Sequence, residues 1–297
     1  MRMKDGVVMN EEIKIQGPYN FKQALNRLGI DPLSQISIEK QSIKIPLIIE
    51  ENEILVNISQ TGSIESPVFK IETKDIIDEV KLINRLNEIF HWDVPLETIY
   101  AHFQGTDLAE LFQQFRGTPF ICDFQLYGCL MKTIIHQQLN MAFAIVLSNR
   151  FQQQFGRERE GVWFYPSPEE VSKLTVNDLR ALQFSQRKAE YVIDCSKLIA
   201  DGLLNIDSLK RMDDEEVIER LTAIRGIGRW TAENFLMFGL GRLDLFPVLD
   251  IGIQNGMKKY YKTEKKPPKE EMIEKSEAWK PFRTYASLYL WESLETN

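Results

Sequence analysis

The segment from residue 221 to residue 234 reads LTAIRGIGRWTAEN. An acidic, amphipathic stretch leads into it, and an apolar stretch with helical spacing follows it at once. Two glycines around one apolar residue favour a tight turn, and because neither Gly226 nor Gly228 carries a Cβ, the backbone there can approach another molecule closely. The amides that open the second helix then point outward and form an anion site. The segment therefore predicts two helices joined by a turn that binds a phosphate group.

Side chains beside the turn fit that interpretation. We predict phosphate contacts from Gly226, Gly228, Arg225, Arg229 and Thr231, because such contacts hold a protein on a nucleic acid backbone without reading a base. The alternative is an ordinary turn between two packed helices, in which a glycine ends the first helix. A bare Gly-x-Gly favours that alternative, whereas the wider sequence favours the phosphate site.

The charge of the chain is unevenly distributed. Its 297 residues carry 36 Lys and Arg against 43 Asp and Glu, a net charge of −7, which by itself argues against a nucleic acid partner. Residues 222–263, in contrast, hold six basic and three acidic side chains. A local basic surface is what phosphate binding requires, and the overall charge is a poor guide to it.

The cysteines point to a reducing compartment. Cys122, Cys129 and Cys195 form no Cys-x-x-Cys pair, so no metal site is predicted. An odd number of thiols suits the cytosol. The first residues lack an apolar signal segment, and no run approaches 18 uncharged apolar residues. We therefore expect a cytoplasmic protein with no membrane partner.

The first hundred residues alternate apolar and polar positions, which is the period of a half-buried antiparallel sheet. The alternation covers four segments, residues 11–17, 35–50, 53–60 and 67–74. Residues 19–28 and 75–91 have helical spacing instead. We therefore predict a small antiparallel α+β domain over residues 1–105.

From residue 106 to residue 297 the apolar spacing is helical. Short polar breaks separate the predicted helices, which cover residues 108–115, 123–155, 168–173, 176–182, 186–200, 206–210, 213–223, 231–239, 251–261, 269–275 and 281–294. No strand is predicted among them. The predicted fold class is therefore α+β, an antiparallel β-rich N-terminal domain followed by an all-α domain.

A single carboxylate stands out downstream of the turn. Asp250 lies in FPVLDIGIQ, residues 246–254, after an apolar stretch and at the predicted start of a helix. One interpretation is an N-cap, which is worth about 1 kcal/mol. A partly desolvated carboxylate facing a cleft could instead act as a base or stabilise charge. Both roles can hold together.

Four segments of the chain resemble one protein family, and they follow one another in the order that this family has. GIGRWTA, residues 226–232, and PVLDIGI, residues 247–253, resemble the helix-hairpin-helix base-excision DNA glycosylases and their catalytic Asp. WKPFRTYASLYLW, residues 279–291, is similar to the last helix of the alkylbase branch, the 3-methyladenine DNA glycosylase II type of bacteria. IIHQQLN, residues 134–140, looks like that branch's Gln-containing segment at the DNA wedge.

The resemblance implies roles for individual residues. Asp250 would stabilise the cationic sugar, and Gln138 would be the wedge that fills the gap left by a flipped base. The base pocket would comprise Trp230, Trp291 and Asn234, because indole stacks well on an electron-poor alkylated purine.

Each of these roles has a structural alternative. The two tryptophans could be helical core, and Gln138 could be an exposed residue between helices. Asn234 could hydrogen-bond a base edge or satisfy a neighbouring backbone group.

The reaction type follows from one position of the motif. Bifunctional relatives such as endonuclease III carry Lys where this chain has Trp230, and the lysine amine forms a Schiff base that leads to strand cleavage. An indole cannot do so, which predicts a monofunctional glycosylase of alkylated purines that leaves an abasic site.

The resemblance also implies the partners. They are duplex DNA with damaged bases, bound by a monomer that in a bacterium acts at the nucleoid, with no cofactor except a monovalent cation that the hairpin carbonyls can bind. The alternatives are a non-catalytic DNA-binding module and a glycosylase for oxidised or deaminated bases.

Overall fold

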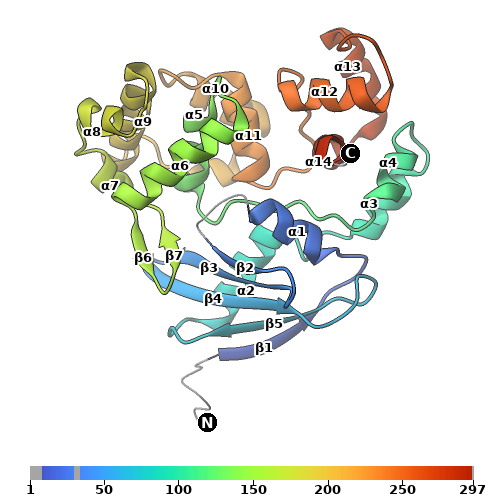
Figure 1. Ribbon diagram of the computed structural model, residues 1–297, viewed down its shortest axis with the longest axis horizontal. Helices are drawn as coiled ribbons and strands as arrows, with labels where there is room; N and C mark the ends of the chain where they lie inside the picture. The colour runs from blue at the N-terminus through green and yellow to red at the C-terminus, as the bar shows by residue number, and fades with distance from the viewer. Residues whose placement is uncertain (1–8, 30–33, 296–297) are drawn as a thin grey trace.

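The computed structural model describes residues 9–29 and 34–295. Figure 1 shows a sheet at the base of the molecule with helices above it. Among the described residues its strands lie in the order β1 (Met9–Lys14), β5 (Val68–Thr73), β4 (Asn52–Gln60), β3 (Ser42–Ile49) and β2 (Gln35–Ser37), and every neighbouring pair is antiparallel. The predicted N-terminal antiparallel sheet is confirmed.

The register of the sheet follows from the alternation in sequence. Ile45 of β3 lies opposite Val56 of β4, and Ile58 of β4 lies between Ile43 and Ile71 of the flanking strands. All five side chains are buried. Because residues two apart point to the same face of a sheet, they form a continuous apolar surface for the helices above.

Two helices cover that surface. They are α1 (Phe21–Leu28) and α2 (Glu79–Phe90), both close to the predicted ranges. Phe69 of β5 contacts the edge of the Phe21 ring and stacks on Trp92, which follows α2. Aromatic contacts therefore join both helices to the same face of the sheet.

The rest of the described chain is mainly helical. Its α-helices are α3 (Leu96–Phe103), α4 (Ala109–Gln114), α5 (Leu126–His136), α6 (Met141–Phe155), α7 (Pro168–Val171), α8 (Val176–Ala181), α9 (Gln186–Ala200), α10 (Asp214–Thr222), α11 (Arg229–Phe238), α12 (Ile251–Tyr260), α13 (Lys269–Ser276) and α14 (Arg283–Glu295). Two 3-10 helices, η1 (Asp207–Arg211) and η2 (Glu277–Trp279), join them. This arrangement confirms the predicted α+β fold class.

The predicted helix over residues 123–155 is broken in two. α5 ends at His136, and α6 starts at Met141 after the Asn140 side chain accepts a hydrogen bond from the Phe143 N–H. Between them Gln138 has a left-handed backbone, with φ of 56°. The prediction was wrong because the apolar spacing continues through the break and hides it.

A β-hairpin interrupts the helical part, so the prediction that this part contains no strand was also wrong. Strands β6 (Arg157–Arg159) and β7 (Val162–Phe164) are antiparallel. Glu160 and Gly161 between them have φ of 52° and 79°, as in the two-residue turns that suit a hairpin. Three residues a strand are too few for an alternating pattern to be recognised.

The hairpin joins the helical part to the sheet. Arg159 of β6 donates a hydrogen bond to Asp75 beyond β5 at 2.5 Å, and Arg157 forms an ion pair with Glu53 of β4. Val162 and Leu55 lie in one small buried cluster. Charges and apolar contacts therefore fix the hairpin on the sheet.

The main hydrophobic core extends across the predicted domain boundary between residues 105 and 106. The rings of Phe103, Phe112 and Tyr289 stack in succession, with centroids 3.7 Å and then 4.0 Å apart. Phe103 precedes the proposed boundary, whereas Phe112 of α4 and Tyr289 of α14 follow it. The boundary at residue 105 stays a prediction, and the two parts share a core.

The thiols are buried throughout. Burial raises the pKa of Cys122 and of Cys195 to about 12, so both are protonated at neutral pH and unreactive. In residues 9–29 and 34–295 no three His, Cys, Asp or Glu side chains group to hold a metal ion. Over the same residues, no helix combines the length and the apolar character that crossing a bilayer requires.

Candidate active site

The helix-turn-helix predicted from residues 221–234 consists of α10, a turn and α11. Gly226 has φ of 91°, and a Cβ on it would lie 2.2 Å from the ring of Tyr191, so both the backbone and the neighbour require glycine. Gly228 is the N-cap of α11, and a Cβ on it would meet no described atom within 4 Å. The turn is therefore fixed against the protein at Gly226 and open to solvent at Gly228.

The first amides of α11 are available to a ligand. A helix leaves its first N–H groups without intrahelical partners, and no side chain among the described residues caps this helix. The positive end of the helix dipole adds to the attraction for an anion. The open Gly228 lies at this end, so a phosphate can approach it closely.

Both predicted arginines lie at the surface beside the turn, yet each is paired. Arg225, 62% exposed, contacts Glu190 at 2.7 Å, and Arg229, 51% exposed, contacts Glu215 at 3.0 Å. Arg229 also donates to Glu233 at 2.8 Å. A phosphate would have to compete with these carboxylates for the guanidinium groups.

Thr231, a predicted phosphate contact, lies in the first turn of α11. Its side chain is 1% exposed, and its hydroxyl oxygen accepts a hydrogen bond from Gln137 at 2.8 Å. Because the hydroxyl points into the protein, only its backbone N–H in the first turn of α11 is left for the predicted phosphate contact.

Three helices meet at Asp250. The carboxylate caps α12 by accepting from the Ile253 N–H at 2.9 Å through Oδ1. Oδ1 also accepts from Nε1 of Trp291 on α14 at 3.0 Å, and Oδ2 accepts from Nε1 of Trp230 on α11 at 2.9 Å. The structure thus brings together the predicted catalytic residue and the two predicted pocket tryptophans.

Gly252 makes this arrangement possible. A Cβ there would lie 2.8 Å from the indole of Trp291 and 2.9 Å from Oδ1 of Asp250. Any larger residue would push the indole away from the carboxylate. Sequence reasoning missed this role, although Gly252 stands inside the motif, because the partner lies on a distant helix.

The Nε1 edges of both indoles point at the Asp250 carboxylate. One face of Trp291 stacks on Phe238, with ring centroids 5.8 Å apart. Asn234 is 7% exposed and its Nδ2 donates to the Trp230 carbonyl at 2.8 Å. The amide group therefore satisfies a neighbouring backbone group, one of the two alternatives considered for it.

The predicted wedge residue lies in the break between α5 and α6. Gln138 is exposed on the left-handed residue of this turn. Its neighbour Gln137, which was not singled out, donates from Nε2 to the Gly226 carbonyl and to the Thr231 hydroxyl, each at 2.8 Å. The side chain of Gln138 is therefore exposed to solvent, whereas that of Gln137 is bonded to the turn between α10 and α11, which we call the hairpin.

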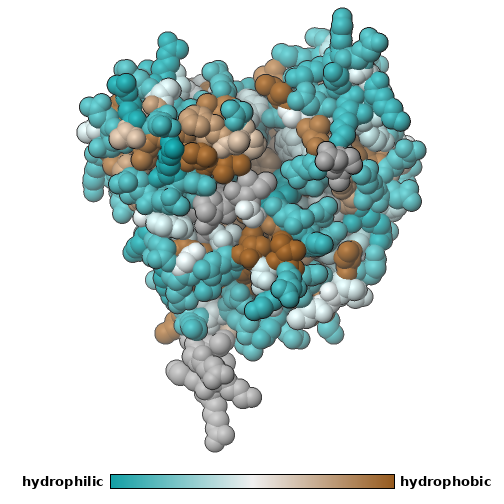
Figure 2. Space-filling model, viewed as in Figure 1, coloured by the Kyte–Doolittle hydropathy of each residue, from teal (hydrophilic) through white to brown (hydrophobic). Residues whose placement is uncertain are grey.

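The surface is hollowed near these elements. Figure 2 shows a notch between the lobe that carries α10 and α11 and the lobe that carries α12 and α13. Asp250 joins helices of both lobes through its hydrogen bonds. The Asp250 carboxylate therefore connects the two lobes that border the notch.

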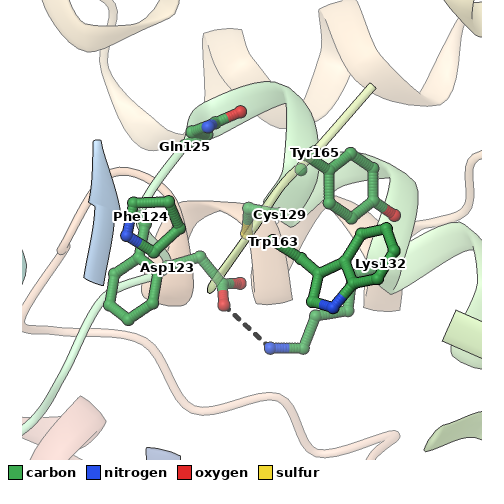
Figure 3. Close-up of a pocket in the computed structure, with 9 residues that line it drawn as sticks. Asp123, Phe124, Gln125, Cys129, Lys132, Trp163 and Tyr165 are labelled. Atoms are coloured by element: carbon green, nitrogen blue, oxygen red, sulfur yellow. Dashed lines mark hydrogen bonds and ion pairs between the residues drawn. The ribbon is translucent and has the colours of Figure 1, made fainter. Parts of the chain in front are cut away.

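Two cavities in the described structure lie elsewhere. One of about 20 Å³, enough for a single water, lies between the sheet, α5 and β7 (Figure 3), beside the ion pair of Lys132 and Asp123 at 2.8 Å. The other, about 720 Å³, is an open groove between α4 and the end of α12. Among the described residues, neither lining includes Asp250 or its two tryptophan partners.

The comparisons with known proteins agree with this geometry. The family model described as "HhH-GPD superfamily base excision DNA repair protein" matches residues 131–281, which run from within α5 to two residues before α14 and include the turn between α10 and α11 and Asp250. The chain belongs to the HhH-GPD superfamily. A relative from Bacillus subtilis, a "Putative DNA-3-methyladenine glycosylase", is 42% identical over 286 residues, which are 96% of this chain and 99% of the relative. The superfamily and its alkylbase branch, predicted from the four motifs, are confirmed.

Solved structures show the same HhH-GPD fold over the whole chain. The 3-methyladenine DNA glycosylase of Archaeoglobus fulgidus superposes with a TM-score of 0.84 at 23% identity, over 96% of this chain and 98% of that one. The 8-oxoguanine glycosylase/lyase of Clostridium acetobutylicum, solved with duplex DNA, gives 0.76 at 19% identity, over 98% and 99%. The N-terminal sheet is thus part of the shared fold. Membership of the superfamily makes this chain a DNA-binding DNA glycosylase of base excision repair.

Proposed function

We propose that this chain is a monofunctional DNA glycosylase that hydrolyses the N-glycosidic bond of alkylated purines in duplex DNA and leaves an abasic site. The observation that carries the proposal is the pair of indole N–H bonds from Trp230 and Trp291 to Asp250. The B. subtilis relative, named for 3-methyladenine, supports the substrate class.

Asp250 supplies the electrostatic part of the reaction. Breaking the glycosidic bond leaves positive charge on the sugar, and a fixed carboxylate lowers the energy of that cation. The carboxylate also accepts a proton from, or orients, the water that attacks the anomeric carbon. Because the indole donors hold both oxygens in place, little reorganisation is needed as charge develops.

Trp230 determines whether the DNA strand is cleaved after the base is released. An indole nitrogen has no lone pair available for attack, so this position cannot form the Schiff base that precedes strand cleavage in lyase-type relatives. Water is therefore the nucleophile, and the product keeps an intact backbone. This is the basis for proposing a monofunctional enzyme.

The indole faces account for the choice of base. An alkylated purine is electron-poor or cationic, and stacking it on Trp is worth about 0.5–2 kcal/mol more than stacking a neutral ring. Phe238 already covers one face of Trp291, so a base would use the exposed remainder of the site. The preference is modest, and the weaker glycosidic bond of an alkylated base adds to it.

The DNA is held by the open turn and opened by the wedge. Phosphate oxygens would accept from the first amides of α11 beside Gly228, with Arg225 and Arg229 adding charge. Gln138, exposed on its strained turn, would fill the space of the flipped nucleotide. The proposal includes action as a monomer in the cytoplasm, at the nucleoid of a bacterium.

Hydrolysis of the glycosidic bond would use the Asp250 carboxylate, the two indoles and a water molecule. A monovalent cation, expected from the resemblance, would lie against the turn carbonyls and add positive charge facing the phosphate. The Ile224 and Gly226 carbonyls accept from the Ile227 N–H and from Gln137, and each keeps a second lone pair for such an ion.

Methylated duplex DNA tests the proposal. The expected result is release of free 3-methyladenine and 7-methylguanine, with strand breaks only after alkali. Asp250→Asn keeps an N-cap residue and should abolish release while DNA binding survives. Strand breaks without alkali would show a lyase, and release of an oxidised base instead would change the substrate class. Tight binding without any release would leave a DNA-binding module.

A further inference from the structure

A buried lysine caps the C-terminal end of α5. Lys188 of α9 is 8% exposed, and its Nζ donates to the carbonyls of Ile134 at 2.9 Å and Gln137 at 3.1 Å. These carbonyls are among those that a helix leaves unpaired at its C-terminus, where the dipole also favours a cation. Burial lowers the pKa of Lys188 to about 8, so the ammonium is still charged at neutral pH.

The side chain of Gln137 continues the connection to the hairpin. Its Nε2 donates one hydrogen to the Gly226 carbonyl and the other to the Thr231 hydroxyl, at 2.8 Å each. Both amide hydrogens are therefore used, and only the amide nitrogen can serve these two acceptors. The backbone of Gln137 is fixed to α9, and its side chain is fixed to the turn between α10 and α11.

The next residue is the proposed wedge. Gln138 has φ of 56°, which is costly for a residue with a side chain and persists only where the surroundings hold it. On its other side, Asn140 caps α6 through the Phe143 N–H. The turn between α5 and α6 is therefore held at both ends.

We propose that Gln137 and Lys188 are positioning residues that keep the wedge in register with the phosphate-binding hairpin. The inference rests on the proposed function, because it assigns both residues a part in base flipping. We assign neither side chain a contact with DNA. A wedge must enter the stack while the hairpin holds the backbone, and a shift of about 1 Å between the two is enough to impair such a step.

The test distinguishes an effect on base flipping from an effect on cleavage of the N-glycosidic bond. Base release is measured in single turnovers from 7-methylguanine paired with cytosine and from the same lesion in a one-nucleotide bulge, where little opening is needed. In parallel, 2-aminopurine beside a stable abasic analogue reports opening of the stack through its fluorescence. Gln137→Met keeps the length of the side chain and removes both donors.

We expect Gln137→Met to release the paired lesion at least tenfold more slowly, to release the bulged lesion within threefold of wild type, and to lose at least half of the fluorescence rise. Gln154→Met, at an exposed glutamine of α6, is the matched control and should change nothing. Lys188→Met should act in the same direction. Lys188→Arg, which keeps a charged donor, should restore most of the activity, with melting temperatures measured alongside.

Equal losses on both lesions, or no loss on either, would overturn the positioning role, because a merely structural defect does not distinguish them. An unchanged fluorescence rise in Gln137→Met would overturn it as well. If the wild type opens the stack but releases no alkylated base, the proposed substrate fails and fluorescence alone decides the role of Gln137. If the wild type opens nothing, the wedge and this inference fail together.

Discussion

The Trp230 indole Nε1 lies 2.9 Å from Oδ2 of Asp250, a residue 20 positions further along the chain. The contact joins the first turn of α11 to the N-terminus of α12. It connects the helix that we propose to bind phosphate to the carboxylate that we propose to be catalytic. Loss of the N–H should therefore affect catalysis more than folding.

Trp230→Phe tests this relationship because it keeps an aromatic ring and removes the donor. A hydrogen bond to a charged group contributes about 1.5–3 kcal/mol, so base release should fall by roughly 10- to 150-fold. Single-turnover release from methylated duplex DNA measures the effect. Trp163→Phe, on β7 and away from the site, is the control and should stay within twofold of wild type. Equal losses in both variants would contradict the assignment.

Gly252→Ala should damage the site without unfolding the protein. The added Cβ would lie 2.8 Å from the Trp291 indole and displace it from the carboxylate. We expect at least a tenfold loss of base release, with the melting temperature lowered by only a few degrees, since the indole can move toward the hollow. Release at the wild-type rate would show that the Trp291 bond is dispensable.

The two hairpin glycines should respond differently. Gly228→Asp puts a negative charge where a Cβ meets no described atom, so stability should change by less than about 0.5 kcal/mol. DNA affinity should fall for all sequences alike, with a shallower salt dependence. Gly226→Ala should instead destabilise the fold, because of its φ of 91° and the ring of Tyr191. A sequence-selective loss in Gly228→Asp would mean that the turn reads bases.

Glu215→Gln should tighten binding to undamaged DNA. Glu215 is the exposed partner of the terminal nitrogens of Arg229, and its replacement makes these nitrogens available to a phosphate while Nε stays bonded to Glu233. We expect about a threefold lower Kd and a steeper dependence on salt, both measured by fluorescence anisotropy at several salt concentrations. Glu219→Gln on the same helix changes the net charge equally and serves as control. If both variants bind equally well, only net charge matters and the competition at Arg229 is refuted.

Stability should fall as the pH is lowered, partly through His91. Burial lowers the pKa of His91 from 6.5 to about 4. The unfolded chain therefore takes up a proton at this site from pH 6.5 downward, whereas the folded chain does so only near pH 4, and stability is lost between the two. At pH 5 this amounts to about 2 kcal/mol.

His91→Asn isolates this contribution. Asparagine tolerates the left-handed backbone at this position, where φ is 50°, and does not titrate. The difference in unfolding free energy between pH 7 and pH 5, from urea titrations, should be smaller in the variant by about 2 kcal/mol. An unchanged difference would show that His91 does not contribute.

Regular periods made most of the fold predictable. The apolar alternation of β3 and β4 and the helical spacing after residue 106 each reflect burial of one face, which a sequence records directly. The break at Gln138 and the hairpin of β6 and β7 escaped prediction because each occupies only a few residues. Their geometry depends on partners such as Lys188 and Asp75, which lie 50 or more positions away.

The site was predictable where a motif carried it. Asp250, Trp230 and Trp291 came from the resemblance, and the structure brings them into contact. Glu190 and Glu215, which pair with Arg225 and Arg229, could not be foreseen, because ion pairs between separate helices leave no local pattern. Glu233, in contrast, lies four residues after Arg229 on the same helix, a spacing that the sequence does record. Thr231 was predicted as a phosphate contact, and the bond from Gln137 to its hydroxyl inside the protein could not be foreseen, because the two residues lie 94 positions apart.

The stacked rings of Phe103, Phe112 and Tyr289 have a consequence for dissecting the molecule. A fragment starting at residue 106 would keep Asp250 and the turn between α10 and α11. It would lack Phe103, and one face of the Phe112 ring would be uncovered. The hairpin of β6 and β7 would lose its support as well. We expect such a fragment to expose apolar surface and to aggregate, so the sheet would be required for the stability of residues 106–297 although we assign it no contact with the base.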